Sequence, residues 1–469
     1  MNIKIIERIL HLVWLVFIFI GLSGCASTSV FMSYPAQMSL TKQDINTSQY
    51  ANAQQTLAKH RDSADKILYM MERGRVSFLA QDFGSSVKDF DIVIEAMEAN
   101  EEKAKITARG VLGQSASLLS NENAIPYAGE GYERVFVHHY QALNYLFKNN
   151  LEAAGVEVRR ANIEQQLALR KYEEEVDQAL EGQREKSILE SNKSYIEKYE
   201  AMSKVAASVK NSFQNAYTFY VSGLIYEARG EFNNALIDYK KALEIYPDNK
   251  YLIAEVARLA KRLNFVDDYN KVKTKAIPNL ANELNENEGK VVILYEYGYV
   301  PQKQEVQIPF SFDFQLQNLT LPTYMGGQGA SPKLSVSNNG RNMAKTEPIV
   351  NVAALAAKAL HEKIPTNVVR QLSRMVLRQK AKTSMDDSLL GAVVNIGHFL
   401  LNRADLRSWL TLPSVAQIAH LPVKAGKQEL VLSVAGKQET VPVSIRSGRT
   451  SIIYVHYVDN RFTTTVVNI

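Results

Sequence analysis

The spacing of apolar positions changes near residue 285 and divides the chain into two parts. From Ile45 to Leu284, apolar residues recur at helical, heptad-like spacing with few breakers, which predicts almost uninterrupted helix. After the polar break Asn285–Gly289, the run Val291–Gly298 is mostly apolar and β-branched, and residues 305–317 alternate between apolar and polar. Both patterns are typical of β-strands, so the sequence predicts helices first and a sheet afterwards.

The clearest internal pattern within the helical part lies at Phe219–Pro247. Small residues at Gly223 and Ala235 would let two antiparallel helices cross closely, and Pro247 would end the second helix. This spacing is that of the tetratricopeptide repeat (TPR), a 34-residue helix–turn–helix unit. The matching positions, which we expect to be packing residues, are Gly223, Tyr226, Ala235, Tyr239, Ala242 and Pro247.

Two weaker copies of the same pattern precede this repeat. Their turns are expected at Asn149–Ala154 and at Asp82–Ser86. In the earlier copy, Gly74 takes the place of the crossing glycine and Phe90 that of the second tyrosine. Because a single repeat cannot bury its apolar face alone, the three copies together predict an irregular α-solenoid of at least three helical pairs.

The C-terminal part combines helices with short strands separated by turn residues. The expected fold class is therefore mostly α, with an N-terminal TPR-like α-solenoid followed by a smaller α+β domain with an antiparallel sheet. The last four strands would form an antiparallel meander. The expected elements are helices at 350–385 and 389–402 and strands at 428–434, 439–446, 451–458 and 461–468.

The first 25 residues have the features of an export signal. Lys4 and Arg8 give a basic start, Ile9–Ile20 is a short apolar run, and Leu22–Cys25 reads Leu-Ser-Gly-Cys. This segment resembles the bacterial lipoprotein box, which implies cleavage before Cys25 and lipidation of its thiol. An uncleaved anchor or a chance cysteine is the alternative. Ala26 and Ser27 follow without an aspartate, which by resemblance indicates the periplasmic face of the outer membrane.

These features give an expected division of the chain. Residues after the cysteine are rich in Ser, Thr and Gln with little periodicity, which is typical of a flexible tether. The expected parts are a signal peptide at 1–24, a lipidated cysteine and flexible tether at 25–44, a TPR-like helical domain at 45–284 and an α+β domain at 290–469.

Composition narrows the chemistry further. Cys25 is the only cysteine, so disulfides and cysteine metal sites are excluded. The net charge of +5 is spread along the chain and does not indicate nucleic acid as a partner. His138 and His139 are adjacent, so on a helix they point about 100° apart and cannot share a metal. We find no catalytic constellation and expect no metal, no cofactor and no enzymatic activity. The remaining enzyme alternative places a site between the two parts, near His398, Asp405 and Arg407.

The sequence contains better candidates for a protein-binding surface than for a catalytic site. Tyr217, Tyr220 and Arg229 lie on or beside the first helix of the main repeat, and Tyr and Arg are the residue types that carry interface energy. They are candidate partner-binding residues, with helix packing as the alternative. Trp409 is expected to fill the core between helix and sheet, with Asp405 capping a turn or pairing with Arg407.

Three stretches of the chain resemble a known group of proteins. Tyr127–Glu133, His139–Leu146 and Ala404–Pro413 are similar to segments of an uncharacterised family of Gram-negative bacterial lipoproteins with tetratricopeptide-like repeats. The resemblance implies no specific activity. Some members are encoded near lipoproteins that resemble activators of penicillin-binding proteins, which implies a role in the cell envelope.

The sequence therefore predicts an outer-membrane-anchored periplasmic lipoprotein that acts as a TPR-type protein-binding scaffold in cell-envelope biogenesis or maintenance. Its expected partners are the membrane, through the lipid on Cys25, and a periplasmic or envelope protein; neither nucleic acid nor a small-molecule substrate is indicated. The alternatives are a cell-envelope enzyme and a secretion or motility accessory lipoprotein.

Overall fold

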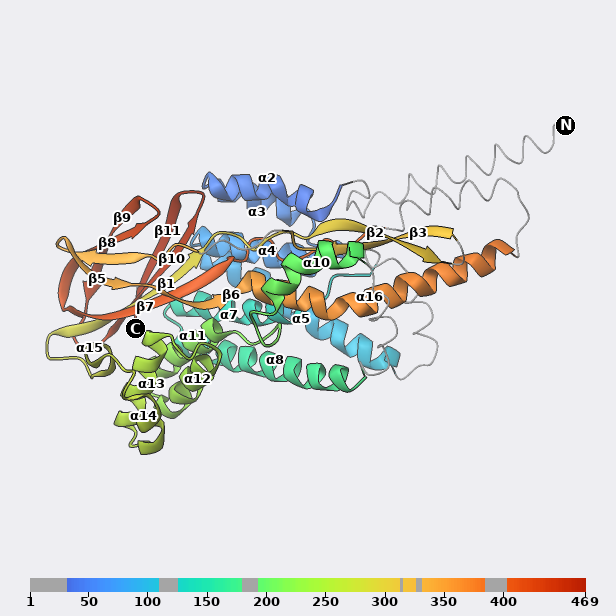
Figure 1. The fold of residues 1–469 in the computed structure, drawn as a ribbon. Helices are drawn as coiled ribbons and strands as arrows, with labels where there is room; N and C mark the ends of the chain where they lie inside the picture. Colours follow the sequence, from blue (N-terminus) through green and yellow to red (C-terminus); the bar gives the residue numbers. More distant parts are fainter. Residues whose placement is uncertain (1–31, 109–124, 179–192, 313–314, 326–330, 384–402) are drawn as a thin grey trace, which may run out of the picture.

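The protein folds as a layer of helices on one face of a sheet, with a second sheet on the opposite face (Figure 1). This arrangement comes from a computed structural model. The residues it describes are 32–108, 125–178, 193–312, 315–325, 331–383 and 403–469.

Three helical pairs form the layer that lies against the sheet. In each pair, the residue at the turn has a positive φ: Gln81, Asn149 and Gly230. The following N–H then bonds back to a carbonyl in the last turn of the first helix, which is the same C-terminal cap three times. The turns lie where the three repeat copies predict them. The pairs are α4 (Lys66–Leu79) with α5 (Phe83–Ala108), α7 (Gly131–Phe147) with α8 (Leu151–Gln178), and α11 (Ala216–Ala228) with α12 (Phe232–Ile245).

The predicted crossing points are confirmed. A Cβ atom on Gly223 would lie 2.3 Å from the ring of Tyr239, and one on Gly74 would lie 2.9 Å from the ring of Phe90. The helices of these pairs can therefore approach only because a glycine stands at each crossing. Tyr226, Ala235, Tyr239 and Ala242 are all buried, and Pro247 follows the end of α12 as expected.

The other helices extend this layer and cover the sheet. The structure differs from the predicted tether at residues 34–44, because α2 occupies them with Tyr34, Met38 and Thr41 buried. The low apolar content of this segment concealed a helix with only a narrow buried stripe. The remaining helices are α2 (Tyr34–Asn46), α3 (Tyr50–Ala58), α10 (Lys193–Ala206), α13 (Lys250–Arg262), α14 (Val266–Val272), α15 (Pro278–Ala281) and α16 (Val352–Thr383).

The C-terminal part contains a five-stranded sheet in the order β11-β10-β1-β7-β6, a four-stranded sheet in the order β5-β4-β8-β9, and the hairpin β2-β3. In the five-stranded sheet, β1 is parallel to β10 and antiparallel to β7. The strands are β1 (Glu288–Tyr297), β2 (Gln304–Phe312), β3 (Gln315–Thr323), β4 (Ser335–Asn338), β5 (Arg341–Lys345), β6 (Glu347–Asn351), β7 (Val415–Lys424), β8 (Gly426–Val434), β9 (Lys437–Ile445), β10 (Thr450–Val458) and β11 (Arg461–Asn468).

Two predictions about the strands are wrong. The alternating stretch 305–317 is not one strand but the outgoing arm and the start of the returning arm of the β2-β3 hairpin. The four C-terminal strands do not form a meander, because β8-β9 belongs to the four-stranded sheet and β10-β11 to the five-stranded one. Alternation shows that one face of each strand is buried, but it does not show which sheet buries it. The predicted helix 389–402 lies outside the described residues.

Candidate functional site

The concave face of the three helical pairs is closed by the chain's own sheet. The first helix of every pair sends a polar side chain to the Glu296 carboxylate on β1: Arg75 from α4, Tyr140 from α7 and Tyr217 from α11. Arg75 Nη2 lies 2.5 Å from Glu296, and the Tyr454 hydroxyl donates to the same carboxylate at 2.6 Å. All five side chains are buried, so this network fastens the three pairs to one strand.

A segment without helix or strand, residues 404–409, and the turn that follows it fill the groove of the first two pairs. Glu72 of α4 accepts the backbone N–H of Leu410 at 2.6 Å and that of Thr411 at 3.1 Å. Glu133 of α7 accepts the N–H of Trp409 at 2.7 Å. Backbone donors of the protein's own chain thus occupy the position that a bound peptide would take in an open solenoid groove.

The predicted roles of residues 405–409 are confirmed. The Arg407 guanidinium pairs with Asp405 at 2.7 Å and with Asp65, just before α4, at 2.6 Å. Trp409 is completely buried and packs against Phe90 and other aromatic rings of the inner helices. These side chains are structural, since each is engaged in holding the segment to the helices. His398 and Cys25 lie outside the described residues.

Of the three candidate partner-binding residues, Tyr217 and Tyr220 are buried and Arg229 is partly exposed. Tyr217 and Tyr220 are 0 % exposed and Tyr217 donates to Glu296, whereas the buried Tyr220 hydroxyl has no hydrogen-bond partner among the residues that the structure describes. Arg229 donates to Glu231 and to the Leu151 carbonyl. Tyr217 and Tyr220 are therefore wrong as contact residues, because Tyr217 is covered by the sheet at Glu296 and Tyr220 packs against Tyr239 of α12.

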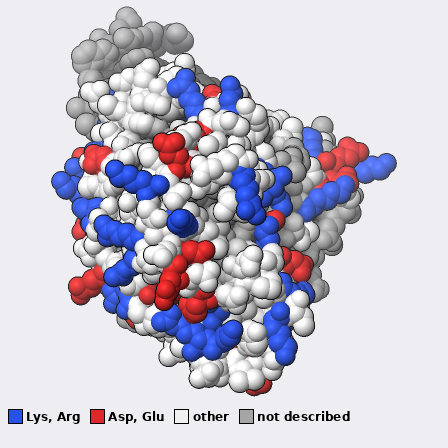
Figure 2. All heavy atoms as spheres, turned by 90° about the vertical axis from the view of Figure 1, so that its left-hand side faces the viewer, with Lys and Arg blue, Asp and Glu red and all other residues white. Residues whose placement is uncertain are grey.

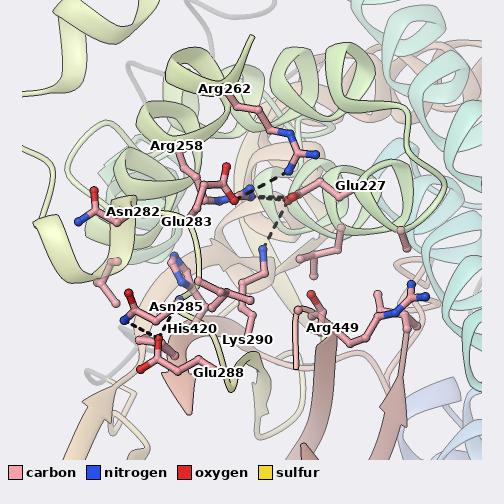
Figure 3. Close-up of a pocket in the computed structure, with 18 of the residues that line it drawn as sticks. Glu227, Arg258, Arg262, Asn282, Glu283, Asn285, Glu288, Lys290, His420 and Arg449 are labelled. Atoms are coloured by element: carbon pink, nitrogen blue, oxygen red, sulfur yellow. Dashed lines mark hydrogen bonds and ion pairs between the residues drawn. The ribbon is translucent and has the colours of Figure 1, made fainter. Parts of the chain in front are cut away.

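An open cleft remains beside the third helical pair. It has a volume of about 510 Å³ and lies where α11, α13 and the 279–285 segment meet the ends of β1, β7, β10 and β11 (Figure 3). One wall thus comes from the repeat helices and the other from the sheet. Basic and acidic side chains are interspersed on this end of the molecule rather than separated into fields of one sign (Figure 2).

A network of four charged side chains forms one side of the cleft. Arg258 of α13 pairs with Glu227 of α11 at 2.7 Å and with Glu255 on its own helix. Lys290 of β1 reaches Glu255 at 3.0 Å and Glu227 at 3.5 Å. Two cations and two carboxylates thus neutralise one another across the junction between helix and sheet, as Figure 3 shows for Glu227, Arg258 and Lys290.

The electrostatics keep this network charged. Burial alone would raise the pKa of Glu227 and Glu255, but the neighbouring Lys290 and Arg258 hold the pKa of both carboxyls below the usual value. Burial lowers the pKa of His420, on β7, so its imidazole is neutral at pH 7. These groups stabilise the junction and have no proton to exchange near neutral pH.

Other charged side chains at the cleft have spare bonding capacity. Arg262 stacks over the ring of Phe232 at 3.9 Å and lies 3.8 Å from Glu283. Arg449 is exposed, and no ion-pair partner for its guanidinium occurs among the residues that the structure describes. Asn282 adds an exposed amide. The cleft therefore offers donors and acceptors suited to a polypeptide segment. Within the same residues, no group of three or more His, Cys, Asp or Glu side chains gathers as metal ligands.

Sequence reasoning missed the charged residues of the cleft. Glu255 and Arg258 are three positions apart on α13. The apolar and polar residues of this helix lie on clearly separate faces, and both charged residues lie on its buried side. Charged residues in that position were the available signal. Lys290 carried none, because it is a single lysine at the start of a strand.

Comparison with known proteins supports one tetratricopeptide repeat in this chain. Residues 216–249, which span α11 and α12, match the family model described as tetratricopeptide repeat. No curated protein sequence matches the chain. Among solved structures, two of MamA are 11 % identical over 51 % of this chain, covering 87 % and 92 % of theirs, with a TM-score of 0.29. The TPR2AB-domain:pHSP90 complex of yeast Sti1 is 13 % identical over 51 % of this chain and 89 % of that chain, with a TM-score of 0.20. These TM-scores are too low to support an argument about fold or function.

Proposed function

We propose that this protein is a non-enzymatic scaffold, anchored to the periplasmic face of the outer membrane through a lipid on Cys25, that holds a protein partner in cell-envelope biogenesis or maintenance. The matched repeat supports the scaffold role, because TPR units are typically protein-binding modules. The lipoprotein box supports the anchor. Within the described residues, no helix is both long and apolar enough to cross a membrane.

The observation that carries the proposal is the contrast between a filled groove and an open cleft. The groove of α4 and α7 is occupied by residues 409–411, so the partner must bind elsewhere. The cleft beside α11 and α13 has the volume for a few residues of an extended chain, and it presents Arg449, Arg262 and Asn282 to solvent. We therefore assign partner contact to this cleft.

The cleft also lies in the place where the enzyme alternative would put its site, between the repeat helices and the C-terminal part. Its buried titratable groups do not favour catalysis. Glu227 and Glu255 stay ionised against Arg258 and Lys290, whereas a general acid or base works best with a pKa near the ambient pH. Arg407 is paired with both Asp405 and Asp65, outside this cleft.

Site-specific photocrosslinking in cells tests the proposal. A photoreactive benzoylphenylalanine replaces Asn282 in the cleft, and a matched control carries it at Asn270, which is exposed on α14 outside the cleft. We expect one envelope protein to crosslink at 282 and not at 270. The crosslink should be lost with Arg449→Glu and kept with Lys273→Glu, a charge reversal at an exposed site outside the cleft. Equal crosslinking at both sites, or loss with both variants, would contradict the assignment.

A further inference from the structure

The outward face of α2 carries exposed apolar side chains, and the one charged residue beside it is the partly buried Asp44, four positions after Leu40. Leu40 is 68 % exposed and Met32, just before the helix, is 51 % exposed. Ala36, Ser39 and Gln43 are the other exposed residues of this face. On a helix the positions 36, 39, 40 and 43 are neighbours, so they form one continuous strip.

The region around the strip has few charges, and its only cation is held away from the strip. From Met32 to Ala58 the only charged residues are Lys42 and Asp44, and both are partly buried. The Lys42 ammonium lies 5.0 Å from the centre of the Tyr299 ring. By contrast, the much shorter stretch from Lys261 to Lys275 carries seven charged residues. The α2–α3 region is therefore much poorer in charge than the region of α13 and α14.

The strip is held in a fixed direction. Tyr34 is buried and its hydroxyl donates to Glu72 at 3.0 Å. At the other end of α2, Asn46 accepts from the Tyr299 hydroxyl at 2.8 Å and donates to Asp459 at 3.3 Å. Because both ends of the helix are fastened to other parts of the protein, α2 cannot roll to bury Leu40.

The strip is also close in sequence to the proposed lipid. Tyr34 follows Cys25 by nine residues, which span about 30 Å when fully extended. In Figure 1, α2 lies on the upper side of the molecule, whereas α12, α13 and α14 lie on the lower side. A lipid on Cys25 would thus keep the charge-poor side near the bilayer and the α13–α15 side away from it.

We propose that the outward face of α2 rests on the surface of the lipid bilayer, with Leu40 and Met32 in the interfacial region. The inference rests on the proposed lipidation of Cys25. A helix face with exposed apolar side chains and a single carboxylate at its margin can lie in the headgroup layer, with Leu40 and Met32 below the surface and Asp44 at the level of the water. The cleft beside α11 and α13 then faces the aqueous side, where a partner can reach it.

Depth-dependent fluorescence quenching tests this orientation. Lipidated full-length protein carries Leu40→Cys labelled with an environment-sensitive nitrobenzoxadiazole dye, and the matched control carries Val266→Cys with the same dye. Val266 is 64 % exposed on α14. Both are reconstituted on phosphatidylethanolamine–phosphatidylglycerol vesicles that contain doxyl-labelled lipid, and co-flotation with the vesicles is measured on the same samples.

We expect both proteins to float with the vesicles, the label at position 40 to be blue-shifted, and its quenching to be severalfold stronger than at position 266. Flotation with equal quenching at the two positions would overturn the orientation and leave the anchor intact. Absence of flotation would overturn the lipid anchor and the orientation together. The variant Leu40→Glu should reduce quenching of a label at Ser39, and Val266→Glu should leave it unchanged.

Discussion

The groove of the first two helical pairs and the cleft beside the third pair are built from similar helices, but the groove is filled and the cleft is open. In the groove, Glu72 and Glu133 accept backbone N–H groups from residues 409–411, so the protein has supplied its own ligand. In the cleft, Glu227 pairs instead with the side chains of Arg258 and Lys290. Whether the carboxylates on the first helix of each pair bind backbone N–H groups or cationic side chains therefore decides whether the groove beside that pair is closed or open.

The energetic consequences of the two arrangements differ as well. The groove contains carboxylates, such as those of Glu72 and Glu296, that are completely buried. Loss of one partner there leaves a charged group that water cannot solvate. At the cleft, Glu255 is equally enclosed, but the outer charges Glu288, Arg262 and Arg449 border solvent, where water can replace a lost partner. Substitutions should therefore have large effects on the closed side and small effects on the open side.

The largest effect is expected from Glu296→Ala. This change leaves the Arg75 guanidinium buried without its counter-ion and removes the acceptor of three tyrosine hydroxyls, so the free energy of unfolding should fall by about 3–5 kcal/mol. Urea denaturation measures it. The control Glu288→Ala, at the cleft, should change stability by less than about 1 kcal/mol. Similar losses for both variants would remove the distinction between the two regions.

The pH dependence should have opposite signs in the two regions. Burial raises the pKa of Glu72 to about 7, above its usual 4.5, so the folded state binds the proton more tightly and stability falls as the pH rises from about 4.5 to 7. The shift corresponds to about 3 kcal/mol. The pKa of Glu227 and Glu255 is lowered, so their contribution is present above pH 4.5 and is lost on acidification.

Unfolding free energies measured between pH 4 and pH 8 test this contrast. The loss of stability towards pH 8 should be smaller in Glu72→Gln than in the unaltered protein, because a glutamine does not titrate. The loss towards pH 4 should be smaller in Glu227→Gln. The same slopes in all three proteins would contradict the assignment of these groups.

Gly223→Ala should destabilise the third pair by about 1–3 kcal/mol, because the added methyl would stand 2.3 Å from the Tyr239 ring and force the helices apart. Thermal unfolding followed by circular dichroism measures the loss. Gly84→Ala is the matched control, since its methyl would meet only an Asp82 oxygen at 3.6 Å. A stable Gly223→Ala protein would show that the crossing of α11 and α12 is wider than described.

The smallest effect distinguishes two neighbouring tyrosines. Tyr217→Phe removes a hydroxyl that donates to Glu296 at 3.3 Å and should lower stability by about 1 kcal/mol. Tyr220→Phe removes a hydroxyl that is buried without a partner, so it should leave stability unchanged or increase it slightly. Chemical denaturation of both variants gives the comparison, and a larger loss for Tyr220→Phe would reverse the assignment.

The sequence predicted what depends on local chemistry. The turns at Gln81, Asn149 and Gly230 and the crossing at Gly223 follow from residues close together in the chain, so repeat spacing located them. The assignment of strands to two sheets and the filling of the groove depend on contacts between distant segments. The Glu72–Leu410 hydrogen bond spans 338 positions and left no local pattern. For the same reason Tyr217 was mistaken for a surface residue.

That long-range hydrogen bond also sets an order of events during synthesis and folding. The helices that carry Glu72 and Arg75 are made early, yet the groups that satisfy these buried charges arrive 221 and 338 positions later. Until Glu296 and Leu410 have been synthesised, α4 can form a helix, but its charged side chains Glu72 and Arg75 lack the groups with which they pair in the folded protein. Closing so long a loop is slow. The N-terminal half is therefore kept from reaching its final packing until nearly the whole chain is available, so its folding cannot be completed segment by segment from the N-terminus.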